Sequence, residues 1–417
     1  MSAARPLAVV HVSPSLDVSY GGPATSVPSL AAALRDQGVA GALVSVDPPA
    51  PAADNALITA KGLSWRRARP ARVRLGYYAA DLVEQLDAAV DEIDARVIHC
   101  HSFWGYPAIV AASVARRREL ALVVSPRSEF YPGSLRRSRW LKRGFMAAAG
   151  RRILSAAAFV HATEPGEGEG ARALGYQGRV VLAPNGIDAS IGDRLMDRAD
   201  ALRHLNLDPL PARRALFLAR LHPRKGLETL LHAWALTGLA TRGWRLMIAG
   251  DAADPAYAER LRRLSADLGL AEVVDWLGHV DDAARGAALS LADLFVLPSQ
   301  FENFGLSIAE ALACGVPVIT TTATPWPALE TDGAGWLVPP ADAPALGAAL
   351  AAAAARGAEG LKAMAPAARA AVSRLDWAAA ARPLAEAYRE ITAGATITGG
   401  QAAAPRMSRV LATETMS

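Results

Sequence analysis

The sequence predicts an α/β protein made of two doubly wound, Rossmann-like parallel-sheet domains that face each other across a cleft. Short apolar runs alternate with helical stretches along the chain, as in parallel sheets covered by helices on both faces. The 417 residues are too many for one ordinary core. A stretch rich in turn residues, 184–211, separates two halves, each about the size of one nucleotide-binding unit.

Six strands are expected in each half, each a short apolar run bounded by turn residues. In the first half they are 7–12, 42–46, 97–99, 120–125, 159–162 and 180–183. In the second half they are 215–218, 244–249, 273–277, 294–297, 317–320 and 335–338. We expect an N-terminal domain of residues 1–190, a C-terminal domain of residues 191–376, an amphipathic helix 377–391 crossing back over the first domain, and a disordered tail 392–417.

Composition narrows the class of protein. The chain is 52% hydrophobic and 20% charged, which is typical of a globular protein and not of a disordered one. Its two cysteines, Cys100 and Cys314, provide neither a disulfide framework nor metal-ligand spacing, which favours the reducing cytoplasm. We expect no export signal, and no spanning helix because no bulky apolar run reaches about 18 residues.

Basic residues concentrate in the first half. Residues 1–190 carry 22 Lys/Arg against 16 Asp/Glu, and the remainder carries 22 against 24. The excess lies in two clusters, Arg66, Arg67, Arg69, Arg72 and Arg74, and the segment Arg136 to Arg143 followed by Arg151 and Arg152. Such a surface attracts anionic lipid headgroups or a phosphorylated acceptor, and the alternative is a solvated basic helix. Nucleic acid is not expected, because no reader motif accompanies the charge.

The segment 301–312 is the most informative motif. Glu302 and Glu310 stand eight residues apart, and Gly305 lies between them where a helix should begin after the strand 294–297. A helix N-terminus offers backbone N–H groups without intrahelical partners, so this turn is a ready anion site. One acid can then face a neutral hydroxylated group while the phosphate is held elsewhere, which is the layout that a nucleotide-sugar site needs.

Two further candidate turns follow the first expected strand of each half. Arg220 and Lys225 come after the strand 215–218, and two fixed cations beside a helix N-terminus suit a diphosphate. The alternative is a solvated basic loop. Gly21 and Gly22 follow the first strand, where glycine lets the backbone approach a ligand closely. They do not form the dinucleotide fingerprint, because its third glycine is missing.

Two more strand ends carry polar and aromatic side chains. Because side chains alternate along a strand, His99 and His101 are expected to point to opposite faces and not to share a metal. His101 could then orient a sugar hydroxyl, and Trp104 could stack on a sugar ring or simply pack. Arg127 follows the next strand and could meet a phosphate or an acidic sugar, with Glu129 as its alternative ion-pair partner.

Together these segments resemble the retaining, nucleotide-sugar-dependent glycosyltransferases of family 4, which have the GT-B fold. The matching segments are 21–23, 99–102, 184–188, 217–226, 249–251, 277–280 and 301–317. The resemblance extends from residue 7 to about residue 391, and its motifs are more specific in the second half. It implies transfer of a sugar from a nucleoside diphosphate sugar to a glycan or lipid-linked acceptor, with no metal and no further cofactor.

The resemblance also implies roles for single residues. The donor would contact Gly21, Gly22, Arg220, Lys225, Asn303, Phe304, Gly305, Leu306, Glu310, His279 and Val280. Arg220 and Lys225 would hold the diphosphate and Glu310 the ribose, and the backbone at 279–280 would read the base. Glu302 would bind the sugar hydroxyls. Glu302, together with His101 at the strand end, is the expected catalytic set. The leaving phosphate would help to deprotonate the acceptor on the same face, so no side-chain nucleophile is needed; the paired-acid layout of hydrolases does not apply.

The acceptor side departs from the family pattern. Many members have a histidine where this chain has Ser125-Pro126-Arg127, which resembles a branch that builds surface polysaccharides and has Ser-Pro-Arg-Gly at this place. Here Ser128 replaces the glycine, while Thr324-Pro325-Trp326 again resembles that branch. Arg127 and Trp104 are the expected acceptor-side residues. The protein is expected in the cytoplasm, with peripheral attachment to the inner membrane face through Arg136 to Arg143.

Three other functions compete with this interpretation. A nicotinamide or flavin oxidoreductase also has doubly wound domains, but the missing dinucleotide fingerprint counts against it. A non-catalytic nucleotide-sugar-binding protein would bind the donor without transfer. A nucleotide-sugar epimerase fits the pair of acids less well.

Overall fold

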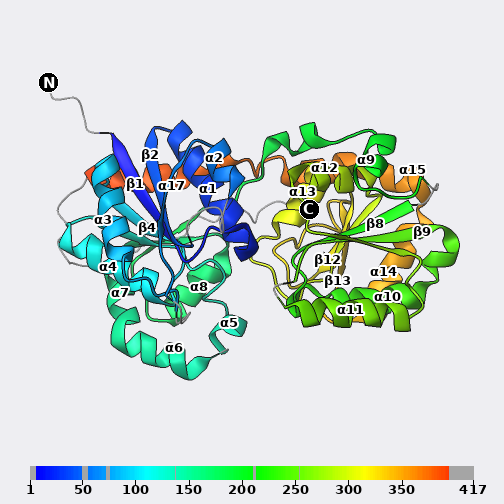
Figure 1. Ribbon diagram of the computed structural model, residues 1–417, viewed down its shortest axis with the longest axis horizontal. Helices are drawn as coiled ribbons and strands as arrows, with labels where there is room; N and C mark the ends of the chain where they lie inside the picture. The colour runs from blue at the N-terminus through cyan, green and yellow to red at the C-terminus, as the bar shows by residue number, and fades with distance from the viewer. Residues whose placement is uncertain are drawn as a thin grey trace, which may run out of the picture.

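The computed structural model describes residues 6–48, 55–71, 76–136, 138–209, 213–252 and 254–393. They form two α/β domains side by side, each built on one parallel sheet (Figure 1). The first sheet has the strand order β3-β2-β1-β4-β5-β6-β7 and the second the order β10-β9-β8-β11-β12-β13. The predicted fold class is confirmed.

The first sheet contains one strand more than expected. Its strands are β1 (Leu7–Ser13), β2 (Val39–Val46), β3 (Ser64–Ala68), β4 (Val97–Cys100), β5 (Ala121–Val124), β6 (Ala157–Ala162) and β7 (Arg179–Leu182). The second sheet consists of β8 (Arg213–Leu218), β9 (Trp244–Ala249), β10 (Val274–Gly278), β11 (Leu294–Leu297), β12 (Val318–Thr321) and β13 (Gly335–Val338). Every strand pair is parallel.

Helices cover both faces of each sheet, and in the C-terminal domain one layer contains α9, α12 and α13 and the other α10, α11 and α14 (Figure 1). The first domain has α1 (Gly22–Asp36), α2 (Ala56–Ala60), α3 (Leu82–Ile93), α4 (Tyr106–Arg117), α5 (Pro132–Arg136), α6 (Arg139–Phe145), a π-helical turn (Met146–Gly150), α7 (Arg151–Ala156) and α8 (Pro165–Ala173). The helices of the second are α9 (Arg198–His204), α10 (Leu227–Thr237), α11 (Pro255–Asp267), α12 (Asp282–Leu291), α13 (Leu306–Ala313), α14 (Ala343–Ala355), α15 (Gly357–Lys362) and α16 (Ala365–Val372). The described residues contain four short 3₁₀ turns, namely Val18–Tyr20, Ala189–Arg194, Pro223–Lys225 and Leu239–Arg242.

The unexpected strand β3 is an edge strand rich in arginine. Arg66 pairs with Glu92 of α3 at 2.8 Å, and the guanidinium of Arg67 lies 4.0 Å from the ring centroid of Trp65. The sequence Ser-Trp-Arg-Arg-Ala lacks the apolar run by which the other strands were predicted. Two members of the first basic cluster therefore have partners within the fold, while Arg72 and Arg74 lie outside the described residues.

The helix α17 (Trp377–Ala393) returns from the second domain to the first, as Figure 1 shows. Its apolar side, which includes Leu384 and Tyr388, packs with Val9, Leu34 and Phe159 in one buried cluster. The N–H of Ile187 donates to the carbonyl of Leu375 at 2.6 Å, so the two chain crossings between the domains pair with each other.

Gly186 is required at this double crossing. A Cβ at Gly186 would lie 2.5 Å from the Cα of Trp377, so no larger residue fits between the two segments. The predicted tail lies largely outside the described residues, which end at residue 393. Among the described residues, no helix is both long and apolar enough to cross a membrane.

Candidate functional site

The turn between β11 and α13 lies at the carboxyl edge of the second sheet. Gly305, with φ of 77°, precedes α13 and supplies no side-chain cap. The first N–H groups of the helix, those of Leu306 and Ser307, have no acceptor within the helix. The indole N–H of Trp326 donates to the carbonyl of Phe304 at 2.8 Å and holds the turn. This helix terminus has the geometry of an anion site.

The two motif loops of the second domain come together at Glu302. Its Oε1 lies 2.5 Å from Nζ of Lys225 and accepts a hydrogen bond from the hydroxyl of Ser299 at 2.7 Å. The Lys225 and Glu302 side chains are 23% and 10% exposed. The close approach depends on Gly226, where a Cβ would lie 2.1 Å from the carbonyl oxygen of Pro298. Lys225 thus neutralises the first acid of the motif.

Arg220 lies against the glycine turn of the first domain. A Cβ built at Gly21 would be 2.7 Å from Nε of Arg220, and Gly21 has a φ of 90°. Any side chain at Gly21 would therefore displace the guanidinium. A Cβ built at Gly22, the first residue of α1, would have no other atom within 4 Å. The structure brings these two predicted segments together, one from each domain.

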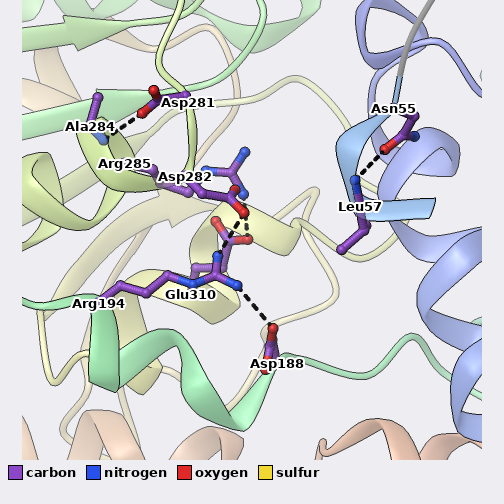
Figure 2. Close-up of polar contacts among 9 residues, drawn as sticks. All are labelled: Asn55, Leu57, Asp188, Arg194, Asp281, Asp282, Ala284, Arg285 and Glu310. Atoms are coloured by element: carbon purple, nitrogen blue, oxygen red, sulfur yellow. Dashed lines mark hydrogen bonds and ion pairs between the residues drawn. The ribbon is translucent and has the colours of Figure 1, made fainter. Parts of the chain in front are cut away.

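Glu310 lies in α13 and faces α12 (Figure 2). Nη1 of Arg285 is 3.1 Å from its Oε1, and Nε of Arg285 is buried without a hydrogen-bond partner. Burial raises the pKa of Glu310, and the Arg285 charge opposes this shift. Arg194, from the connection between the domains, pairs nearby with Asp188 and Asp282 at 3.2 Å each.

His279 and Val280 follow β10, at the same edge of the sheet. Val280 is buried, while His279 is exposed and its Nδ1 lies 3.3 Å from Oδ2 of Asp251. Both residues line a cavity of about 530 Å³ that runs along β10. Neither Glu302 nor Glu310 lines this cavity, so it is separate from the turn before α13.

Four buried histidines lie at the centre of the first domain, and the prediction for two of them was wrong. His99 and His101 were expected on opposite faces, but residues two apart in a strand share a face. Their ring centroids lie 4.0 Å apart. His11 of β1 joins them, and His161 of β6 lies beside His99. Burial lowers the pKa of all four, so they are neutral at neutral pH.

The hydrogen bonds determine which nitrogen of each ring carries the proton. Arg127 can only donate, so Nδ1 of His101 accepts from it at 3.0 Å, and Nε2–H of His101 donates to Nδ1 of His11 at 2.9 Å. The carbonyl of Ala183 accepts from His161 Nε2 at 2.9 Å, which leaves His161 Nδ1 to accept from His99 Nε2 at 3.3 Å.

The remaining lone pair among the four imidazole rings, that of His99 Nδ1, also has a hydrogen-bond donor. Nδ1 of His99 accepts from the hydroxyl of Tyr388 at 2.7 Å. Ligand atoms of His11, His99 and His101 lie within 4.8 Å of one another, a spacing compatible with a metal. The lone pairs are taken by donors, however, and the Arg127 cation adjoins the group, so this set does not suit a metal ion. Both ring nitrogens of His101 are engaged, and the side chain is 1% exposed.

Arg127 adopts a left-handed backbone conformation, with φ of 47°. Its guanidinium donates to Oδ1 of Asn185 at 2.8 Å and to the hydroxyl of Ser26 at 3.3 Å, besides the bond to His101. Burial lowers the pKa of Arg127 to about 10, which still leaves it charged at neutral pH. Sequence reasoning did not identify Asn185 as its partner, although Asn185 belongs to a segment that carried the family resemblance.

Glu129 does not pair with Arg127, which corrects the alternative drawn from the sequence. Its carboxylate accepts from the hydroxyl of Ser102 at 2.8 Å and from the N–H of Phe103 at 2.5 Å. Burial raises the pKa of Glu129 to about 7. The indole N–H of Trp104 donates to the Glu129 carbonyl at 3.3 Å, and the ring packs on Phe103.

The second basic cluster forms part of an exposed surface on α6. Trp140 and Leu141 are 66% and 78% exposed. The guanidiniums of Arg139 and Arg143 lie 4.8 and 5.2 Å from the Trp140 ring centroid. Arg137 lies outside the described residues. Apolar and cationic groups therefore occur side by side on this helix.

Both halves of the chain match family models. Residues 204–371 match the model described as glycosyl transferases group 1, and residues 21–186 match a glycosyl transferase 4-like domain. Among curated proteins, a D-inositol 3-phosphate glycosyltransferase of Segniliparus rotundus is 32% identical over 220 residues, 52% of this chain and 49% of the relative. A phosphatidyl-myo-inositol mannosyltransferase of Mycobacterium leprae is 34% identical over 173 residues, 41% of this chain and 43% of the relative. The chain spans about half the length of these relatives.

Solved structures share the whole fold. HepE of Anabaena, in complex with UDP-glucose, superposes with a TM-score of 0.73 at 21% identity, covering 92% of this chain and 100% of that chain. A sucrose-phosphate synthase from Thermosynechococcus elongatus gives a TM-score of 0.72 at 23% identity, covering 93% and 99%. Both halves of the chain therefore match glycosyltransferase family models, and the whole chain has the GT-B fold.

Proposed function

We propose that the protein transfers a hexose-type sugar from a nucleoside diphosphate sugar to a glycan or lipid-linked acceptor, with retention of anomeric configuration. The observation that carries the proposal is the turn before α13. There Glu302 pairs with Lys225 at 2.5 Å beside an uncapped helix N-terminus, and Glu310 lies one turn further along. An anion and a hydroxylated group can bind next to each other at such a turn.

The proposed donor lies across these groups. Its diphosphate contacts Arg220, Lys225 and the first N–H groups of α13, and Gly21 leaves room beside Arg220. Its ribose hydroxyls bind Glu310, which Arg285 orients. The backbone at 279–280 reads the base, and Glu302 binds the hydroxyls of the sugar.

The proposed chemistry needs no side-chain nucleophile. The leaving phosphate accepts the proton of the incoming hydroxyl on the face from which it departs. Two cations and the helix terminus stabilise the negative charge that develops on it, so no metal is invoked. Glu302 is held by Lys225 and Ser299, which suits a group that positions the sugar. His101 keeps Arg127 in place on the acceptor side.

The relatives support a nucleotide-sugar donor. One curated relative is named a mannosyltransferase, and one solved neighbour is a complex with UDP-glucose. A nicotinamide oxidoreductase is not favoured, because both halves match glycosyltransferase models.

The test is a panel of UDP-, GDP- and ADP-sugars assayed for release of the free nucleoside diphosphate, with and without a lipid extract. We expect release from one class of donor, stimulated by the extract. Binding of a donor without release or transfer would instead support a sugar-binding protein. Thermal stabilisation by NAD alone would contradict the proposal.

We also propose that α6 attaches the protein to the inner face of the cytoplasmic membrane. Trp140 and Leu141 offer apolar groups at a surface that also carries Arg136, Arg139 and Arg143. Arginines near an anionic bilayer contribute about 1 kcal/mol each, and exposed aromatic groups insert at the interface.

Vesicle co-sedimentation tests this attachment. The variant Arg136→Ala/Arg139→Ala/Arg143→Ala is expected to lose most binding to vesicles of phosphatidylglycerol, while wild type binds these and not phosphatidylcholine. The matched control Arg242→Ala/Arg263→Ala/Arg374→Ala removes three exposed arginines of the other domain and should bind like wild type. Equal binding of the triple variant and the wild type would contradict the attachment.

A further inference from the structure

The two domains touch directly at the turn that carries Glu302. The side-chain amide of Asn303 donates to Oγ1 of Thr163 at 2.7 Å. Thr163 follows β6 of the first domain, and Asn303 follows β11 of the second. Beside this bond, the rings of Tyr131 and Phe301 meet edge to face, with centroids 4.4 Å apart. A polar and an aromatic contact therefore join the two domains at one place.

Thr163 is rigidly held on its own side. Its N–H and hydroxyl both donate to Oε2 of Glu167, at 2.7 and 2.9 Å. Glu167 is fully buried, and its other oxygen accepts from the N–H of Ser128, next to Arg127. The contact with Asn303 is thus anchored to the residues that support the acceptor side.

The direction of the hydrogen bond follows from these partners. A hydroxyl has one hydrogen, and that of Thr163 is committed to Glu167, so toward Asn303 it can only accept. Asn303 must therefore present its NH₂ group to Thr163. Its Oδ1 then faces the hydroxyl of Tyr131, 3.5 Å away.

We propose that Asn303 and Thr163 form an interdomain clasp that positions the donor turn against the first domain. Asn303 directly follows Glu302, so its position sets where the proposed sugar-binding carboxylate lies relative to the first domain. Asn303 and Thr163 act as positioning residues. The catalytic part of the inference rests on the proposed function, whereas the bridging of the domains does not.

The kinetic test compares Thr163→Val, Asn303→Ala and their double variant. Each single change is expected to lower kcat about 10- to 100-fold while the affinity for the free nucleoside diphosphate stays within about twofold, because misplacement acts on the reacting geometry. The double variant should be no worse than the poorer single one, since both remove the same bond. Thr163→Ser, which keeps the hydroxyl, should restore most of kcat.

Tyr131→Phe is the matched control, because it removes only the 3.5 Å contact and keeps the ring on Phe301. Multiplying losses in the double variant would overturn the clasp. Small-angle scattering gives a second measurement that needs no donor: the double variant should be more open than wild type. Identical scattering profiles would overturn the clasp even if the proposed transfer proves wrong, and an opened double variant supports it in either case.

Discussion

Lys225→Ala is expected to lower kcat/KM for the donor by about 10²- to 10³-fold, the scale of losing one preorganised electrostatic contact. The ammonium lies 2.5 Å from Glu302, in a site where both side chains are largely buried. Without it, the Glu302 carboxylate keeps only the Ser299 hydroxyl as partner and repels the donor diphosphate. Titration calorimetry with the nucleoside diphosphate and steady-state kinetics measure the effect.

Arg224→Ala is the control for charge alone. Arg224 is the neighbouring cation in the same turn, is exposed, and contributes its carbonyl to the N–H of Gln300, a contact that alanine retains. We expect a change below about threefold, as for other exposed charges. A Lys225→Ala variant with wild-type affinity would show that the donor diphosphate binds elsewhere.

Tyr388→Ala is expected to destabilise the protein by about 3–5 kcal/mol, the range for deleting a large buried aromatic side chain. Tyr388 is fully buried in the cluster that joins α17 to the first sheet. Tyr388→Phe keeps the ring but leaves Nδ1 of His99 without its donor, at an expected cost of about 1–3 kcal/mol. Urea unfolding followed by circular dichroism measures both.

Tyr78→Phe is the matched control, because it removes the hydroxyl of a tyrosine that is 45% exposed. We expect this variant to change the free energy of unfolding by less than about 0.5 kcal/mol. If Tyr388→Ala cost no more than this control, α17 would not be part of the first core.

Apolar runs predicted the strands of both sheets because a parallel strand buried on both faces leaves a clear pattern. The exception, β3, is an edge strand whose arginines find partners in Glu92 and Trp65, and such pairing leaves no apolar run. The turn at Gly305 was predicted because a strand, a glycine and a helix are local features of the sequence.

Two side-chain contacts between distant segments were not predicted. Arg285 reaches Glu310 from another helix, and no spacing in the sequence relates the two. Thr163 meets Asn303 only because the domains are placed as they are. His99 and His101 are different: strand alternation by itself places both side chains on one face, because they are two residues apart.

The return of α17 sets an order for the making of the protein. During synthesis, the first sheet is complete long before residues 377–393 exist. Until then, His99 lacks the Tyr388 hydroxyl, and Val9, Leu34 and Phe159 lack the apolar side of α17 that buries them. The core of the second domain contains no residue of α17, so this domain can fold before α17 has been synthesised. The N-terminal domain is therefore synthesised first but is expected to complete its folding last. Before α17 has packed on it, the nascent first domain is the species most prone to aggregation and to chaperone binding.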